Sequence, residues 1–195
     1  MNKKINISII GTRGYPYVYS GYETFVKQLS ERLVLKDCNV TVYCHKGLFN
    51  KRTKEIKGIK LVYVPTIETK ILSQPIHSFL SIIHACFSNT DVLLVVNSAN
   101  GPFGLLTKLF KVPTAINVDG LEWLRPKWKG LGSIYFKWAS KMATLFYDQI
   151  INDSEEMRKV YLDLFKRDSK VIAYGANIRK SKNPELINKW NLKQR

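Results

Sequence analysis

The sequence predicts an α/β protein with a Rossmann-like, doubly wound parallel sheet. Apolar runs rich in valine and isoleucine recur along the chain and alternate with stretches of helical periodicity. The first apolar run leads into a glycine-bearing loop and then an amphipathic helix, as the first unit of such a sheet does. At 195 residues the chain is long enough for one core of this kind and short for two.

The expected strands and helices follow each other in β-α order. The strands are expected at 5–10, 40–44, 60–64, 91–96, 114–118, 149–152 and 170–173. The helices are expected at 21–35, 75–88, 102–110, 131–147 and 154–165. Right-handed crossovers then place a ligand at the carboxyl ends of the strands. We expect the domain to cover residues 1–177, and residues 178–195 to form a basic tail or the start of an interdomain linker.

The loop after the first strand is a candidate ligand site. Gly-Thr-Arg-Gly-Tyr-Pro at 11–16 precedes Ser20 and Gly21, which begin the first helix. Amides at a helix N-terminus point outward and attract anions, so Arg13, Gly14, Ser20 and Gly21 resemble an oxyanion cradle. The alternative is that the glycines only serve turns.

Two nucleotide-binding patterns are excluded for this loop. The dinucleotide fingerprint needs a third glycine where Pro16 stands, and no acidic residue ends the strand at 40–44. A P-loop needs Gly-Lys-Ser or Gly-Lys-Thr after the glycines, and neither follows. Nicotinamide binding is therefore disfavoured.

The net charge of +16 is the strongest anomaly of composition. It suggests an anionic partner, either nucleic acid, anionic lipid or a phosphorylated substrate, with a generally basic proteome as the alternative. Residues 123–138 interleave aromatic with basic side chains, which is typical of a segment at a membrane surface. Membrane contacts are expected from Trp123, Arg125, Lys127, Trp128 and Lys129. The alternative is an amphipathic helix with its aromatic rings in the core.

Cysteine and histidine usage argues against metal and disulfide chemistry. Cys38, Cys44 and Cys86 are widely spaced, which indicates free thiols in a reducing cytoplasm. His77 and His84 lie about two helical turns apart with no third ligand suggested, so packed histidines are expected. We expect no metal and no cofactor. The apolar run near the amino terminus is too short for a signal peptide or a membrane span.

Four motifs occur in order along the chain. They are Gly-Thr-Arg-Gly-Tyr-Pro at 11–16, Tyr-Ser-Gly-Tyr-Glu-Thr-Phe-Val at 19–26, Asn-Ser-Ala-Asn-Gly-Pro at 97–102, and Asn-Val-Asp-Gly-Leu-Glu-Trp at 117–123 followed by Arg125 and Lys-Trp at 127–128. Residues 4–177 thereby resemble the N-terminal domain of bacterial capsule and cell-wall polysaccharide rhamnosyltransferases, which are retaining GT-B glycosyltransferases. The chain departs from that pattern at Ser20, where a second glycine is usual.

The resemblance implies two Rossmann-like domains that face each other across a cleft. The N-terminal domain would bind a lipid-linked saccharide acceptor, and a C-terminal domain would bind the nucleotide sugar, with dTDP-rhamnose as the candidate donor. This chain resembles only the first domain, so little or no turnover is expected from it alone. The implied location is cytoplasmic and peripheral, on the inner face of the cell membrane.

The resemblance also suggests roles for individual residues. Asp119 ends the strand at 114–118 and is expected to contact the acceptor hydroxyl or the reacting sugar, with Glu122 as the second catalytic candidate. Either carboxylate could instead cap the following helix or pair with Arg125. Asn97 and Asn100 are candidate hydrogen-bond donors to sugar, or turn residues beside a Gly-Pro pair.

A non-catalytic basic domain that binds a membrane or nucleic acid is the competing hypothesis. The lysines are spread over the whole chain, and the sequence contains no helix-turn-helix, zinc-finger or RNP-type signature. A specific nucleic-acid partner is therefore not expected.

Overall fold

The computed structural model describes residues 3–17, 20–67, 69 and 72–175. Its strands are β1 (Asn6–Ile10), β2 (Asn39–His45), β3 (Glu55–Ile56), β4 (Ile59–Val64), β5 (Val92–Val96), β6 (Thr114–Val118), β7 (Gln149–Asn152) and β8 (Lys170–Val171). Its helices are α1 (Gly21–Leu35), α2 (Ser73–Cys86), α3 (Gly104–Leu109), α4 (Leu131–Phe146) and α5 (Glu155–Phe165). Short 3-10 helices occur at η1 (Lys46–Leu48), η2 (Ser98–Phe103) and η3 (Glu122–Leu124).

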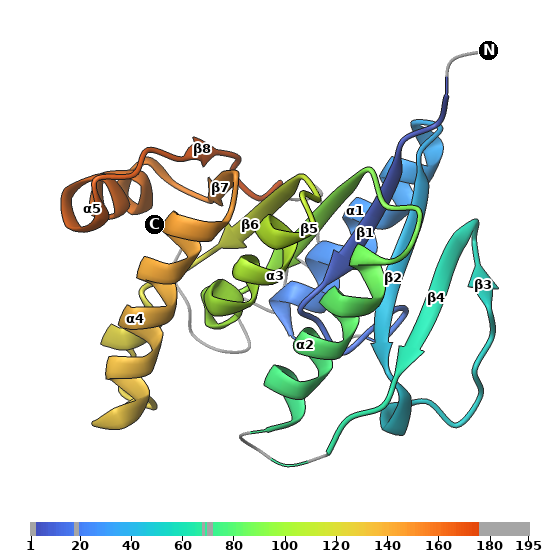
Figure 1. The fold of residues 1–195 in the computed structure, drawn as a ribbon, viewed down its shortest axis with the longest axis horizontal. Helices are drawn as coiled ribbons and strands as arrows, with labels where there is room; N and C mark the ends of the chain where they lie inside the picture. The colour runs from blue at the N-terminus through green and yellow to red at the C-terminus, as the bar shows by residue number, and fades with distance from the viewer. Residues whose placement is uncertain (1–2, 18–19, 68, 70–71, 176–195) are drawn as a thin grey trace, which may run out of the picture.

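The strands form one sheet in the order β3-β4-β2-β1-β5-β6-β7-β8 (Figure 1). Neighbouring strands are parallel except for the short pair of β3 and β4. The chain runs outward from β1 to β2 and β4 and then returns to β5 on the other side of β1. The topological switch point, where ligands bind in doubly wound sheets, is therefore at the carboxyl ends of β1 and β5.

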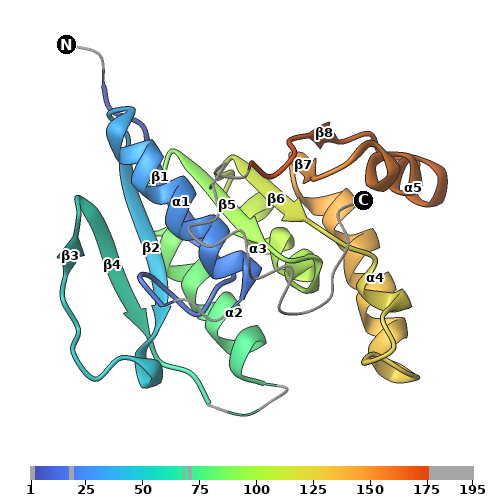
Figure 2. The ribbon, with the colours of Figure 1, turned by 180° about the vertical axis from the view of Figure 1, so that it is seen from behind.

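Helices cover both faces of the sheet. Figure 2 shows α1 in front of the sheet, and Figure 1 shows α2, α3 and α4 in front of the opposite face. The reversal of direction at β1 requires this, because right-handed crossovers in opposite directions place their helices on opposite faces. The sequence-based prediction of a doubly wound, Rossmann-like sheet is confirmed.

Two apolar clusters match these two layers. The cluster under α2, α3 and α4 includes Ile10, Tyr43, Ile82, Leu93, Val95, Ile116, Val118, Phe136 and Tyr147. The cluster under α1 includes Ile9, Val26, Val40, Val42, Ile59, Leu61 and Val96. Successive residues of one strand, such as Ile9 and Ile10, belong to different clusters, because side chains alternate between the faces of a sheet. This burial on both faces explains the continuous apolar runs of the parallel strands.

Three local features differ from the expectation. The connection between β2 and β4, for which the sequence predicts no element, contains η1 and the antiparallel strand β3. Residues 98–103 form η2, so only the second part of the helix expected at 102–110 is α-helical. β8 ends at Val171, two residues earlier than expected. The boundary at 177 and the expected tail at 178–195 lie outside the described residues.

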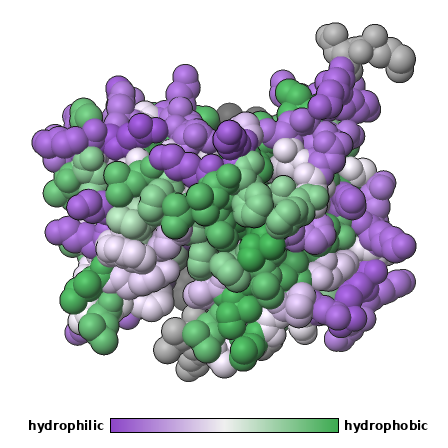
Figure 3. Space-filling model, viewed as in Figure 1, coloured by the Kyte–Doolittle hydropathy of each residue, from purple (hydrophilic) through white to green (hydrophobic). Residues whose placement is uncertain are grey.

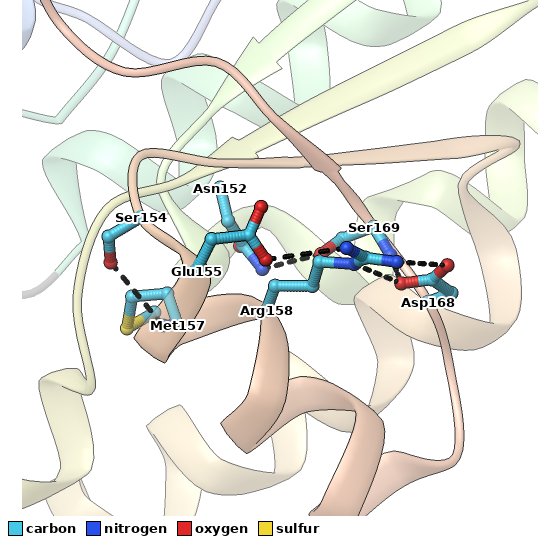
Figure 4. A network of polar contacts seen from close by, with 7 residues as sticks. All are labelled: Asn152, Ser154, Glu155, Met157, Arg158, Asp168 and Ser169. Carbon is cyan, nitrogen blue, oxygen red and sulfur yellow. Dashed lines mark hydrogen bonds and ion pairs between the residues drawn. The ribbon is translucent and has the colours of Figure 1, made fainter.

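Polar contacts fasten α5 to the end of the sheet (Figure 4). The Ser154 hydroxyl accepts a hydrogen bond from the Met157 amide and caps the helix N-terminus. The Arg158 guanidinium contacts Asp168 through Nε at 2.7 Å and Nη2 at 3.0 Å. These contacts fix the segment that leads from α5 into β8 and then to the candidate site.

Candidate functional site

Polar side chains from distant parts of the chain meet at the carboxyl edge of the sheet. Asp119 follows β6 directly, Tyr22 lies in the first turn of α1, and Tyr174 lies three residues after β8. The Tyr22 hydroxyl donates a hydrogen bond to the Asp119 carboxylate. The Tyr174 hydroxyl donates to Asn117 Oδ1 at 2.9 Å and lies 3.5 Å from Asp119 Oδ2. Phe25 packs edge-on against the Tyr174 ring, with 5.2 Å between the ring centroids.

The environment of this cluster raises the pKa values of its members. Burial raises the pKa of Asp119, and the negative charges of Asp153 and Glu122 act in the same direction. The hydrogen bond from Tyr22 and the charge of Arg125 oppose this rise in the pKa of Asp119. Burial and the neighbouring Asp119 carboxylate likewise raise the pKa of Tyr22 and of Tyr174. A half-buried carboxylate with a perturbed pKa at a ligand edge is a functional candidate on physical grounds.

The glycine loop is fixed to the end of β2. The Arg13 carbonyl accepts a hydrogen bond from the His45 amide at 3.1 Å, and the Tyr15 amide donates to Cys44 Sγ at 3.4 Å. Gly14 is buried with φ +128°, and a Cβ there would lie 2.8 Å from Cys44. Close packing against Cys44 therefore explains why residue 14 is a glycine. This agrees with a role in the turn rather than with a ligand contact.

The start of α1 is open, and the Ser20 side chain does not cap it. Ser20 occupies the N-cap position without a side-chain cap, because its hydroxyl donates to Glu23. Glu23 is buried and also accepts a hydrogen bond from the Arg13 amide at 3.1 Å, which ties the glycine loop to the helix. A Cβ at Gly21 would meet no atom within 4 Å. The backbone at Gly21 is thus accessible to a ligand at the positive end of the helix dipole.

The two asparagines after β5 form a turn. Asn97 has φ +75°, and its side chain accepts a hydrogen bond from the Ala99 amide at 2.9 Å. The Asn100 side chain is 1% exposed and donates to the Val96 carbonyl at 2.7 Å. Asn100 therefore has the structural role left open by the sequence, and its burial argues against sugar binding in this conformation.

Glu122 organises the segment that follows Asp119. Its side chain is buried, and its carboxylate contacts Arg125 Nε at 2.9 Å, Lys127 Nζ at 3.6 Å and the Trp128 indole at 2.9 Å. The sequence left open whether Glu122 pairs with Arg125, and the structure contains this ion pair. These contacts explain Glu122 without a catalytic role.

The aromatic segment at 123–138 is divided between the core and the surface. Trp123 is 8% exposed and packs against Phe165, with 6.1 Å between the ring centroids, so the expected membrane contact by Trp123 is not supported. Trp128 is half-buried and packs against Phe136 of the core. Lys127 and Lys129 are exposed. Within the described residues, no helix combines the length and the apolar content needed to cross a membrane.

Two buried histidines lie near the glycine loop. His45, at the end of β2, stacks on His77 of α2 with 3.9 Å between the ring centroids. Burial lowers the pKa of His77 to about 3, and the neighbouring His45 ring contributes to the shift. In the part of the chain that the structure describes, no three histidine, cysteine or acidic side chains are grouped as metal ligands would be. The three cysteines are free thiols.

The architecture is shared with glycosyltransferases of known structure. Sucrose-phosphate synthase from Thermosynechococcus elongatus superimposes with a TM-score of 0.72 at 14% identity, covering 97% of this chain and 53% of that protein. Arabidopsis thaliana UGT89C1, solved with UDP-L-rhamnose, gives a TM-score of 0.52 at 13% identity over 97% of this chain and 55% of its own. Phytolacca americana UGT2, complexed with UDP-2-fluoro-glucose and pterostilbene, gives a TM-score of 0.52 at 9% identity, covering 98% of this chain and 58% of that protein. The chain spans about half the length of these proteins.

The fold is thus that of one domain of the GT-B glycosyltransferases of known structure. The chain belongs to the family described as Domain of unknown function (DUF1972), whose sequence profile matches residues 4–177. No curated protein matches the sequence.

Proposed function

We propose that this domain is the acceptor-binding half of a retaining glycosyltransferase. In this proposal it transfers a sugar, with rhamnose from dTDP-rhamnose as the candidate, to a lipid-linked saccharide during capsule or cell-wall polysaccharide synthesis. The main supporting observation is Asp119, which follows β6 at the ligand edge of a GT-B-type domain and is hydrogen bonded to Tyr22. The ordered motifs at 11–16, 19–26, 97–102 and 117–123 support the narrower assignment.

The proposed chemistry assigns Asp119 to the acceptor. An ionised Asp119 accepts a hydrogen bond from the acceptor hydroxyl and orients its oxygen toward the sugar carbon, which is catalysis by positioning. As the new glycosidic bond forms, the bond from the sugar carbon to the diphosphate breaks, and the departing diphosphate takes the hydroxyl proton. The open N-terminus of α1 at Gly21 faces the same edge and would stabilise negative charge on the departing diphosphate, with Arg13 as its charged neighbour in the loop. Asn97 belongs to the same edge and stays a candidate contact for the sugar.

The nucleotide sugar is assigned to a second domain. UGT89C1 and UGT2 were solved with UDP-sugars, and this chain matches only about half of each. We therefore expect this chain to show turnover only when a donor-binding domain is supplied. The proposed site of action is the cytoplasmic face of the cell membrane, where a lipid-linked acceptor is anchored, with the protein attached peripherally.

A reconstitution assay tests the proposal. The chain, alone and mixed with a separately expressed donor-binding domain, is incubated with dTDP-rhamnose and a membrane fraction that contains lipid-linked saccharides. Product is expected only from the mixture, and Asp119→Asn should lower its rate by about 100-fold or more. Asp163→Asn, on the exposed side of α5, is the matched control and should leave the rate unchanged. Absence of product from a mixture of two folded domains would refute the proposal.

A further inference from the structure

Helix α4 has two apolar stripes, of which only one is buried. The inner stripe packs into the core with Phe136, Ala139, Ser140, Ala143 and Thr144. The second, here called the outer stripe, consists of Leu131, Ile134, Tyr135, Trp138 and Leu145. Its members are spaced by three, four and seven residues, so they follow one another along the helix surface. A helix that is apolar on two sides needs a second partner besides its own core.

The side chains of the outer stripe are exposed to solvent. The exposed fractions are 85% for Leu131, 66% for Ile134 and 48% for Trp138. Neighbouring elements extend the same face through Phe79 of α2 and Leu105 and Leu109 of α3, which are 40%, 45% and 69% exposed. Figure 3 shows apolar residues gathered over the middle of this face. Exposed apolar patches mark interaction surfaces when they are larger than those of ordinary monomers.

The charged side chains on the helices of this face have one sign. Helices α2, α3 and α4 contain no aspartate or glutamate. The helices outside this layer do, with Glu23 and Glu31 in α1 and three acidic residues in α5. Exposed lysines flank the stripe at positions 127, 129, 137 and 141. The face is therefore apolar in its centre and positive at its border.

We propose that the face formed by α2, α3 and α4 docks on an anionic phospholipid bilayer, with the outer stripe in the interfacial region. Leucine, isoleucine and tryptophan side chains would enter the headgroup and upper acyl layer, where tryptophan is enriched. The flanking lysines would contact lipid phosphates through extended side chains. A second copy fits this face less well, because its lysine border would meet an identical lysine border.

The position of this face relates the docking to the candidate site. Leu131 begins α4, and a helix that follows a parallel strand begins at the carboxyl edge of the sheet, which is also the edge of Asp119. Docking would therefore bring the candidate site close to the membrane surface. This use as a site for a lipid-linked acceptor rests on the proposed function, whereas the docking itself does not.

Vesicle sedimentation tests the docking without any sugar chemistry. The 195-residue chain is mixed with vesicles of phosphatidylglycerol and phosphatidylcholine, or of phosphatidylcholine alone, that contain neither glycolipid nor nucleotide sugar. Binding is expected for the anionic vesicles only and should weaken with salt. Ile134→Glu and Trp138→Glu should each lower the partition coefficient by about tenfold or more, because each inserts a charge into the interface. Leu35→Glu, at a position 85% exposed at the end of α1, is the matched control.

Three results would overturn the proposal. The first is that Ile134→Glu and Leu35→Glu change vesicle binding equally, although both variants melt at the same temperature as the parent. The second is equal binding to neutral and anionic vesicles. The third is a dimer in sedimentation equilibrium that Trp138→Glu converts to a monomer, with no vesicle binding by either chain, which would identify a second copy as the occupant. None of these results depends on turnover, so failure of the docking and failure of the proposed reaction are distinguishable.

Discussion

The Tyr22 hydroxyl donates a hydrogen bond to the carboxylate of Asp119, which lies 97 residues later in the sequence. Tyr22 is adjacent to Gly21, where the backbone at the start of α1 is open to a ligand. The hydrogen bond therefore holds the helix N-terminus and the candidate catalytic carboxylate in one arrangement. Tyr174 adds a second hydroxyl 3.5 Å from the other carboxylate oxygen.

Removal of the Tyr22 hydroxyl should change the ionisation of Asp119. The hydrogen bond stabilises the carboxylate and lowers the pKa of Asp119, so Tyr22→Phe is expected to raise that pKa further. In the reconstituted assay, the rise of kcat/KM with pH should shift to higher pH, with about tenfold lower turnover near the old midpoint. Carbon NMR of the labelled carboxyl group measures the same shift directly. Tyr63→Phe, on β4, is the control, and an unchanged profile for Tyr22→Phe would contradict the expectation.

The same carboxylate should destabilise the fold at neutral pH. Because burial raises the pKa of Asp119 above its ordinary value of 3.8, the folded state binds the proton more tightly than the unfolded state does. The free energy of unfolding contributed by Asp119 is then greatest below pH 3.8 and falls as the pH rises through the folded-state pKa. Asp119→Asn is therefore expected to raise the melting temperature at pH 7.5 more than at pH 3.5.

Thermal melts of Asp119→Asn and Asp163→Asn at both values of pH measure this difference. Asp163 is exposed and serves as the matched control. A variant that gains stability while it loses turnover would agree with a carboxylate kept for its chemistry. A loss of stability at pH 7.5 would instead indicate that Asp119 is mainly structural.

Glu122 offers a contrasting test, because its contacts are those of a structural residue. Glu122→Ala leaves Arg125, Lys127 and the Trp128 indole without their shared acceptor, and we expect a loss of about 1 to 3 kcal/mol in the free energy of unfolding. Glu122→Gln retains an acceptor for the indole and should lose less. Urea unfolding measures both losses. A Glu122→Gln protein of parental stability whose turnover falls about 100-fold would restore Glu122 as a catalytic candidate.

The sheet was predictable because its determinants are local. Parallel strands buried on both faces need consecutive apolar residues, as in Val92–Val96, and the intervening helices show their own periodicity. The departures arise where tertiary contacts decide. In η2 the Asn100 carbonyl accepts a hydrogen bond at 3.0 Å from the Tyr147 hydroxyl, which is 47 residues away in the sequence. No pattern near residue 100 contains that contact.

The site was predictable only in part for the same reason. Asp119 could be chosen from its place after a strand, whereas Tyr22 and Tyr174 meet it only once the sheet has formed. The composition of residues 123–138 does not distinguish an interfacial segment from a core segment, and the structure buries Trp123. Its burial depends on Phe165, which is 42 positions further along the chain.

Gly101 tests the close packing of η2 against α4. A Cβ at Gly101 would lie 1.9 Å from the Ala139 carbonyl oxygen, a backbone atom that cannot rotate away. Gly101→Ala is therefore expected to lower the free energy of unfolding by about 1 to 3 kcal/mol or more, because the two elements must separate. Gly21→Ala, where a Cβ would meet nothing within 4 Å, should leave stability unchanged. Equal melting curves for the two variants would show that η2 and α4 are packed less tightly than described.

His77 should make the fold sensitive to mild acid. Burial, together with the His45 ring 3.9 Å away, lowers the pKa of His77 to about 3, from an ordinary value of 6.5. Below pH 6.5 the unfolded chain takes up a proton that the folded chain does not, so the free energy of unfolding falls as the pH falls toward 3. In this window His77 should contribute a slope of about 1.4 kcal/mol per pH unit.

His77→Gln is expected to flatten the pH dependence of the free energy of unfolding, measured by urea unfolding between pH 6 and pH 4.5, whatever its effect on stability at pH 8. Phe87→Gln, at an exposed position directly after the same helix, should keep the parental slope. Parallel slopes for all three proteins would mean that His77 takes up its proton without unfolding.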